Sequence, residues 1–193
     1  MRMNTKEIVD KWHVPLWEGQ RLLGVEFDHL NSFGLNQDDI PLIVKLVENP
    51  NYDYLPGFDI FHGSTDLRQH DYIHLVLGRG IHATDEAFVL GFTAGSTNRV
   101  TSVEKKLYTI FAKHLFPKEY RLKDDEIQVY RDAVKLGYIS DCQPLDKVDF
   151  ESMREMSIKD VRKAIGLEED LLSAYFAIEK RRYPDNPASC RNI

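Results

Sequence analysis

The sequence predicts an all-α fold, a single-domain bundle of about seven helices around one buried helix. Apolar residues recur at helical spacing in successive segments, and Gly or Pro residues separate these segments. The sequence contains no alternating strand pattern of useful length, repeat period, glycine-rich phosphate loop or Gly-x-Ser-x-Gly elbow. With 193 residues, the chain is long enough to bury a core, so one domain spanning residues 1–193 is expected.

Composition and charge exclude several classes of protein. The net charge is −6 with acidic and basic residues interspersed, which argues against nucleic acid as a partner. The only cysteines, Cys142 and Cys190, have no ligand-like spacing and suit a reducing compartment. No apolar run approaches the roughly 20 residues of a membrane span, and the first residues lack a signal-peptide core. We therefore expect a cytoplasmic protein whose membrane contact, if any, is peripheral and at the inner face.

Residues 1–35 are expected to form an N-terminal helical segment. Asn4 or Thr5 can cap a short helix at its start. Trp12 and Trp17 follow within six positions, and two interpretations of them stay open: packing against the core, or anchoring at a membrane interface.

The next segments are a helix over about 37–48 and a long aromatic loop over 49–63. Ile40, Ile43 and Val47 give the helix its apolar spacing, and Pro50 follows its end. Four aromatic residues in the loop are many for a simple connection, so residues 52–61 either cover a site or pin the loop onto the core.

A helix over residues 65–78 carries the pattern that organises the chain. His70, Asp71 and His74 share a stripe about 100° wide on this helix, because successive residues turn by about 100°. The remaining residues are almost all apolar, which indicates a buried helix. Buried imidazoles and carboxylates need partners, and a divalent metal ion would satisfy them together. Satisfied core polar groups without a metal are the alternative.

Glu86 is the expected fourth ligand, delivered by a returning helix. Residues 78–83 read as a turn, Thr84 as the N-cap, and Glu86 as part of the first helical turn. Two imidazoles and two carboxylates suit Zn²⁺ best, and Fe²⁺ or Mn²⁺ if one position stays open. His62 and His82 lie near the motif and are lesser candidates.

Small residues line one side of the helix that follows Glu86. Gly91, Ala94 and Gly95 allow something to approach that backbone closely, either a neighbouring helix or an apolar ligand chain.

The second half of the sequence continues with helices. A capping box at Thr101–Glu104 opens one over about 101–115, and acidic residues from Asp124 open another, which Gly137 should terminate. A short helix begins at Ser157, and a last one ends with the basic residues 180–182. Residues 184–193 are expected to form a frayed tail.

Two stretches together resemble a known family. The pattern His-Asp-x-x-His-x11-Glu, from His70 to Glu86, is similar to that of the fourth Coq protein family of ubiquinone (coenzyme Q) biosynthesis. Asp149-Phe150-Glu151 and Ser157 to Leu167, with the Val161-Arg162 pair, resemble its closing segment, so the likeness covers residues 65–168. The chain departs from the family at residues 58–61, which lack a Thr-Leu-Gly run, and at Asp85, which stands for the usual Gly.

This resemblance implies an enzyme that acts on a polyprenylated aromatic head group, a quinone precursor. The metal would help to remove the ring carboxylate and hydroxylate that carbon, with Glu86 and Arg79 as catalytic residues; the alternative for Arg79 is an exposed loop residue. The side of Gly91 and Gly95 would bind the lipid cofactor or substrate. Expected partners are the prenylated aromatic lipid, proteins of a biosynthetic complex and a second copy in a homodimer.

Two other functions stay open. The protein could be a non-catalytic scaffold that binds prenyl lipid and uses the metal structurally. It could also be an HD-type metal phosphohydrolase, in which the His70-Asp71 doublet joins an upstream His such as His29 and a downstream Asp such as Asp124. The second alternative leaves His74 and Glu86 without a role.

Overall fold

The computed structural model describes residues 12–32, 65–99 and 122–191, and this part of the chain is all-α. It contains seven α-helices: α2 (Leu23–Asn31), α4 (Leu67–Leu77), α5 (Ala83–Ser96), α7 (Asp124–Ile139), α8 (Ile158–Ile165), α9 (Glu169–Arg182) and α10 (Pro187–Arg191). Three short 3-10 helices accompany them: η1 (Leu16–Glu18), η6 (Leu145–Lys147) and η7 (Phe150–Met153). Within these ranges extended backbone pairs only at an isolated bridge between Leu22 and Ser157, so the predicted fold class is confirmed.

Four predicted elements lie outside the described residues: the short helix capped by Asn4 or Thr5, the helix over 37–48, the aromatic loop over 49–63 with His62, and the helix over 101–115.

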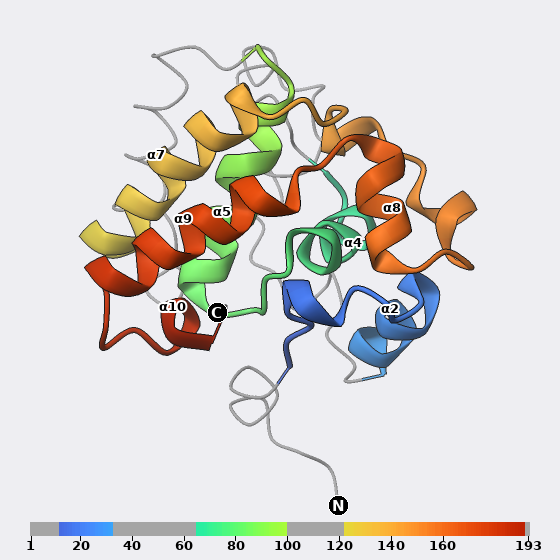
Figure 1. Ribbon diagram of the computed structural model, residues 1–193, viewed down its shortest axis with the longest axis horizontal. Helices are drawn as coiled ribbons and strands as arrows, with labels where there is room; N and C mark the ends of the chain where they lie inside the picture. Colours follow the sequence, from blue (N-terminus) through green and yellow to red (C-terminus); the bar gives the residue numbers. More distant parts are fainter. Residues whose placement is uncertain (1–11, 33–64, 100–121, 192–193) are drawn as a thin grey trace, which may run out of the picture.

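The predicted helix over residues 65–78 is α4, and it lies at the centre of the bundle. Figure 1 shows it nearly end-on, with α2 and α8 on one side and α5 on the other, and α4 contacts all three. Asp66 caps its start by accepting a hydrogen bond from the Gln69 N–H at 2.8 Å. Gly78 ends it in the left-handed conformation, with φ 66°. Every residue from Tyr72 to Leu77 is buried, as the apolar pattern predicts.

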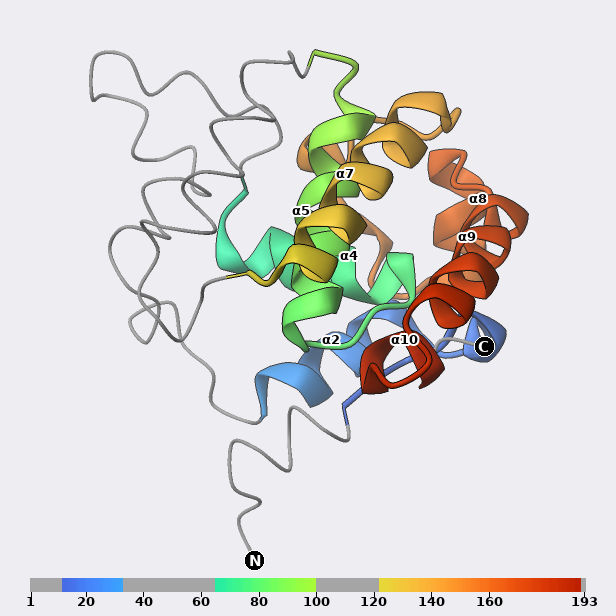
Figure 2. The same ribbon diagram turned by 90° about the vertical axis from the view of Figure 1, so that its left-hand side faces the viewer.

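Helices α5 and α7 pack side by side, as Figure 2 shows, and glycines bring their backbones together. A Cβ atom on Gly91 would lie 2.4 Å from the Tyr130 carbonyl oxygen, and one on Gly95 would lie 2.2 Å from that of Val134. Of the two occupants considered for this side of the helix, the structure therefore shows the neighbouring helix.

Gly137 belongs to the same contact, and the prediction that it terminates its helix is wrong. Helix α7 continues to Ile139. A Cβ atom at Gly137 would lie 2.3 Å from the Phe92 carbonyl oxygen on α5. This glycine is needed for the close approach of two helices. In the local sequence alone, it looks like a glycine that ends a helix.

The short helix predicted at Ser157 is α8, and its buried side holds the end of α4. The Ser157 hydroxyl accepts a hydrogen bond from the Asp160 N–H at 3.1 Å, and Gly166 ends the helix. Arg162, almost fully buried, donates from Nε to the Val76 carbonyl at 2.8 Å and from Nη2 to that of Leu75 at 3.4 Å. The first bond satisfies a carbonyl at the end of α4, and the second adds to the bond that the Leu75 carbonyl accepts from the Gly78 N–H at 3.2 Å.

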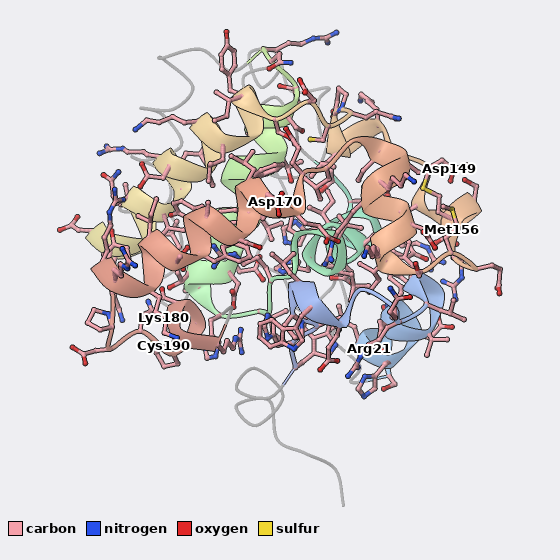
Figure 3. The ribbon with its side chains drawn as sticks, in the orientation of Figure 1. Arg21, Asp149, Met156, Asp170, Lys180 and Cys190 are labelled. Carbon is pink, nitrogen blue, oxygen red and sulfur yellow. The ribbon has the colours of Figure 1, made fainter. Side chains whose placement is uncertain are left out.

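The last predicted helix is α9, but the predicted frayed tail is wrong over residues 187–191. These residues form α10, in which Ala188 and Ser189 are buried. Figure 3 shows Lys180 and Cys190 at the same end of the molecule, where α10 folds back beside α9.

The two N-terminal tryptophans differ in their environments. Trp12 is buried, so the packing interpretation holds for it, whereas Trp17 is 62% exposed. In the described residues, the helices all fall short of the length and apolar character that membrane crossing requires.

Candidate metal centre

Three predicted ligands, His70, His74 and Glu86, meet between α4 and α5. The His70 Nε2 atom lies 2.9 Å from Glu86 Oε2, and the His74 Nε2 atom lies 3.3 Å from Glu86 Oε1. The two Nε2 atoms are 3.0 Å apart. The ligating atoms of the three side chains all lie within 4.8 Å of one another, so a single ion could reach all of them.

The hydrogen bonding of His74 fixes which of its nitrogens faces the group. Its Nδ1 atom lies 2.7 Å from the Gly80 carbonyl oxygen. Because a carbonyl can only accept, Nδ1 must carry the proton, and in the neutral ring Nε2 then offers a lone pair to the group. Metal-binding histidines are typically held in this way, with the second nitrogen donating to a carbonyl.

The group as it stands requires positive charge. A lone pair on each Nε2 and a carboxylate would repel one another at these distances unless a proton or a cation lies among them. Burial lowers the pKa of His74, but the charge of Glu86 and its hydrogen bond, with Asp71, outweigh this and raise it. Burial would raise the pKa of Glu86, but His74 and His70 hold it well below its usual range. The donor set therefore fits a divalent cation.

Access to the group comes from the side of Glu86. The side chain of His74 is 1% exposed and that of His70 is 15% exposed, whereas that of Glu86 is 36% exposed. Three protein ligands of which one is accessible leave coordination positions for water or a substrate, the arrangement of catalytic rather than structural zinc sites.

Asp71, the other predicted ligand, is not part of this group. Its partly buried carboxyl lies beside the group, and removal from water raises its pKa to about 6, although His70 and His74 act in the opposite direction. Its contribution in this structure is negative charge near the two imidazoles.

The start of α5 delivers Glu86, as predicted, but with a different cap. The helix begins at Ala83 with His82 as N-cap, so the prediction of Thr84 as N-cap is wrong. The His82 N–H donates to Asp85 Oδ2 at 3.1 Å. Asp85, where the resembled family has Gly, is fully buried and forms ion pairs with Arg79 and Arg191.

Arg79 is fully buried, so the alternative of an exposed loop residue is wrong. It donates two hydrogen bonds to Glu179, at 3.0 and 2.6 Å. Its guanidinium also stacks on Phe88 and Phe176, 3.9 and 4.2 Å from the ring centres. In this position Arg79 braces the turn between the ligand helices against α9.

The set of ligands for an HD-type phosphohydrolase does not come together in the described residues. His29, on α2, is 58% exposed and lies 3.8 Å from Glu26. Of the groups that could hold a metal in residues 12–32, 65–99 and 122–191, the one found contains neither His29 nor Asp124.

Sequence reasoning missed two residues near the centre. Glu179 is a charged residue on the buried stripe of α9, four residues after Tyr175, and that position could have marked it as a buried ion-pair partner. Trp12 packs edge-on to His74 with 6.5 Å between ring centres, and the local sequence does not predict this contact.

The fold and the site define an all-α protein with a candidate centre of two histidines and one carboxylate on a helical hairpin. In comparisons with protein-family models, curated proteins and solved structures, the chain has no match. The resemblance to the coenzyme Q biosynthesis family therefore rests on its two sequence motifs alone.

Proposed function

We propose that this chain binds one divalent metal ion through His70, His74 and Glu86 and is a metal-dependent enzyme. The observation that carries the proposal is the bond from His74 Nδ1 to the Gly80 carbonyl, which turns the Nε2 lone pair toward the other two ligands. Zn²⁺ suits these donors best, and Fe²⁺ is the main alternative, since two histidines and one carboxylate with open positions also hold iron.

The proposed substrate is a prenylated hydroxybenzoate, a quinone precursor, and this part rests on the sequence resemblance. A bound cation would hold the ring carboxylate and steady the charge that develops as CO₂ leaves. Hydroxylation of the same carbon is a two-electron oxidation, for which we propose O₂ as the oxidant: the carboxylated ring, O₂ and water would give the phenol, CO₂ and H₂O₂. Zn²⁺ has no redox chemistry, so this step would favour Fe²⁺, whereas release of CO₂ alone needs no oxidant. Because such a lipid resides in a membrane, the protein would have to contact the cytoplasmic face of that membrane. Sedimentation with lipid vesicles would test this contact.

Within this proposal, His74 and Glu86 have distinct tasks. His74, buried and anchored at Gly80, fixes the position of the ion. Glu86, at the start of α5 and more exposed, can shift to let a carboxylate or water reach the ion. The helix N-terminus favours its anionic form, so it can bind at neutral pH.

A structural role for the metal, in a lipid-binding scaffold, is the alternative, and the packing of α4 argues against it. Its N-terminus is capped by Asp66 and its last carbonyls are bonded by Arg162. His13 further donates from Nε2 to the Gly78 carbonyl at 3.0 Å. The helix is therefore held by protein groups at both ends without any ion.

The test is metal content together with turnover. We expect His74→Ala to lose most of the bound metal and the release of CO₂ from a prenylated hydroxybenzoate. His29→Ala is the control, because His29 is a histidine outside the group. Full metal occupancy in the His74→Ala protein would refute the metal site, and normal occupancy without CO₂ release in the wild type would refute the reaction.

A further inference from the structure

A second cluster of charges lies behind the turn that joins α4 to α5, and the proposed chemistry does not use it. Arg79, Asp85 and Glu179 are almost fully buried there. Arg79 pairs with Glu179 at 2.6 Å and lies 3.6 Å from Asp85. One guanidinium against two carboxylates leaves a buried negative charge, which is costly unless another cation balances it.

Arg191, on α10, supplies that cation. Its Nη2 atom donates to Asp85 Oδ2, and the side chain is 18% exposed. Its other two nitrogens, Nε and Nη1, are buried and have no hydrogen-bond partner among the described residues. Burying them is unfavourable, so the ion pair with Asp85 must be what holds the guanidinium in this position.

Two further side chains from the same segment reach the ligand hairpin and its brace. Asn186 donates from Nδ2 to the Thr84 hydroxyl at 2.8 Å. The Ser189 hydroxyl donates to Glu179 Oε1, also at 2.8 Å. Residues 186–191 therefore bind the first turn of α5 and the partner of Arg79 at the same time.

The two residues that Arg191 contacts, Gly80 and Asp85, are each joined directly to a proposed metal ligand. The guanidinium lies over Gly80, where a Cβ atom would come within 2.0 Å of Nη2. The carbonyl of Gly80 is the group that orients His74. Asp85, the ion-pair partner of Arg191, directly precedes Glu86 in the chain.

We infer that α10 positions the metal centre, with Arg191 as a positioning residue that acts through Gly80 and Asp85. Arg191 contributes no ligand atom. It keeps the Gly80 carbonyl beneath His74 and holds the first turn of α5 so that Glu86 faces the histidines. This inference rests on the proposed metal binding.

The experiment compares Co²⁺ binding by the full chain and three variants, with Co²⁺ itself as the probe. Arg191→Met should weaken Co²⁺ binding by about tenfold, the lower end of what loss of an outer partner of a metal site costs. Its visible absorption spectrum should also change, because the ligand geometry changes. Arg191→Lys should restore most of both properties, since it restores the charge beside Asp85.

Arg182→Met is the matched control. Arg182 is also near this end of the molecule, and it pairs at 2.6 Å with Asp132 on α7 rather than with Asp85 or Gly80 of the ligand hairpin. We expect its Co²⁺ affinity and spectrum to equal those of the wild type. If Arg191→Met does not fold, Asn186→Ala tests the same segment, with a weaker loss of affinity expected.

The outcomes separate this inference from the proposed function. If the wild type binds Co²⁺ and Arg191→Met binds it with the same affinity and spectrum, while melting at a lower temperature, α10 is only structural and the inference is overturned. If the wild type itself binds no Co²⁺, the metal proposal fails, and the inference fails with it.

Discussion

Replacement of Glu86 tests whether this ligand can shift at the metal or is held as rigidly as His74. Glu86→Gln keeps the shape of the side chain and removes its charge. We expect the variant to keep its fold and part of its metal and to lose most activity, because the two histidines remain and the charge that holds the ion at the accessible side is gone. Metal analysis and CO₂ release measure this.

The comparison for Glu86 is His74→Gln, at the buried and anchored ligand. A larger loss of metal is expected there, since the nitrogen fixed by Gly80 is removed. Equal metal loss in the two variants would mean that Glu86 is an ordinary ligand with no special freedom.

The ion pair of Arg79 and Glu179 predicts an effect on stability at residues that are not ligands. Glu179→Ala leaves a fully buried guanidinium without its main partner, so the free energy of unfolding should fall by about 3–5 kcal/mol. Urea denaturation followed by circular dichroism measures it. Arg182→Ala, which breaks an exposed pair with Asp132, should cost about 0–1 kcal/mol. A loss below 1 kcal/mol in Glu179→Ala would show that Asp85 suffices for Arg79.

At the scale of elements, the contact between α5 and α7 predicts sensitivity at its glycines. Gly95→Leu would drive a side chain into the Val134 carbonyl, since even its Cβ atom would lie 2.2 Å away. We expect a loss of at least 1–3 kcal/mol, roughly the cost of overpacking a core. Thermal unfolding measures the loss, and Ala174→Leu on the exposed face of α9 controls for an added leucine. An unchanged melting temperature in Gly95→Leu would mean that the helices separate easily.

The helices that the sequence predicts correctly are those with local signals. Ser157 and Gly166 bound α8, and apolar residues all around α4 mark it as buried. The errors have distant causes. Gly137 serves a contact with Phe92 rather than a helix end, and α10 is ordered because Arg191 meets Asp85 and Ser189 meets Glu179. Arg191 and Asp85 are 106 positions apart, so no short stretch of sequence contains both partners of that pair.

The candidate site shows the same division. His70, His74 and Glu86 could be predicted because a helical hairpin places them by spacing alone. Asp71 lies outside the group because adjacent residues on a helix point in different directions, whereas His70 and His74, four residues apart, share a face. The sequence could not predict the buried ion pairs behind the turn, because Arg79 pairs with Asp85 and also with Glu179, 100 positions away.

For the whole molecule, we predict that the fold survives removal of the metal. Both ends of α4 are held by protein groups, so the metal-free protein should keep its helical circular dichroism while losing activity. Trp12, buried beside His74, provides a second measurement. In a Trp17→Phe background, Co²⁺ should quench its fluorescence, and Zn²⁺ should compete. Unfolding on chelation would instead make the metal structural.

The ribosome synthesises the chain from its N-terminus, so the ligand hairpin is made before several of the residues that it contacts in the folded protein. All three ligands emerge together within residues 70–86, before Arg162, Glu179 and Arg191, which support the hairpin from later in the chain. Arg162 is separated from Val76 by 86 positions, and Glu179 from Arg79 by 100. Under the proposal of metal binding, a nascent chain therefore presents all three ligands before this support exists. The buried support of the hairpin is complete only when α8, α9 and α10 have been synthesised and have packed against it.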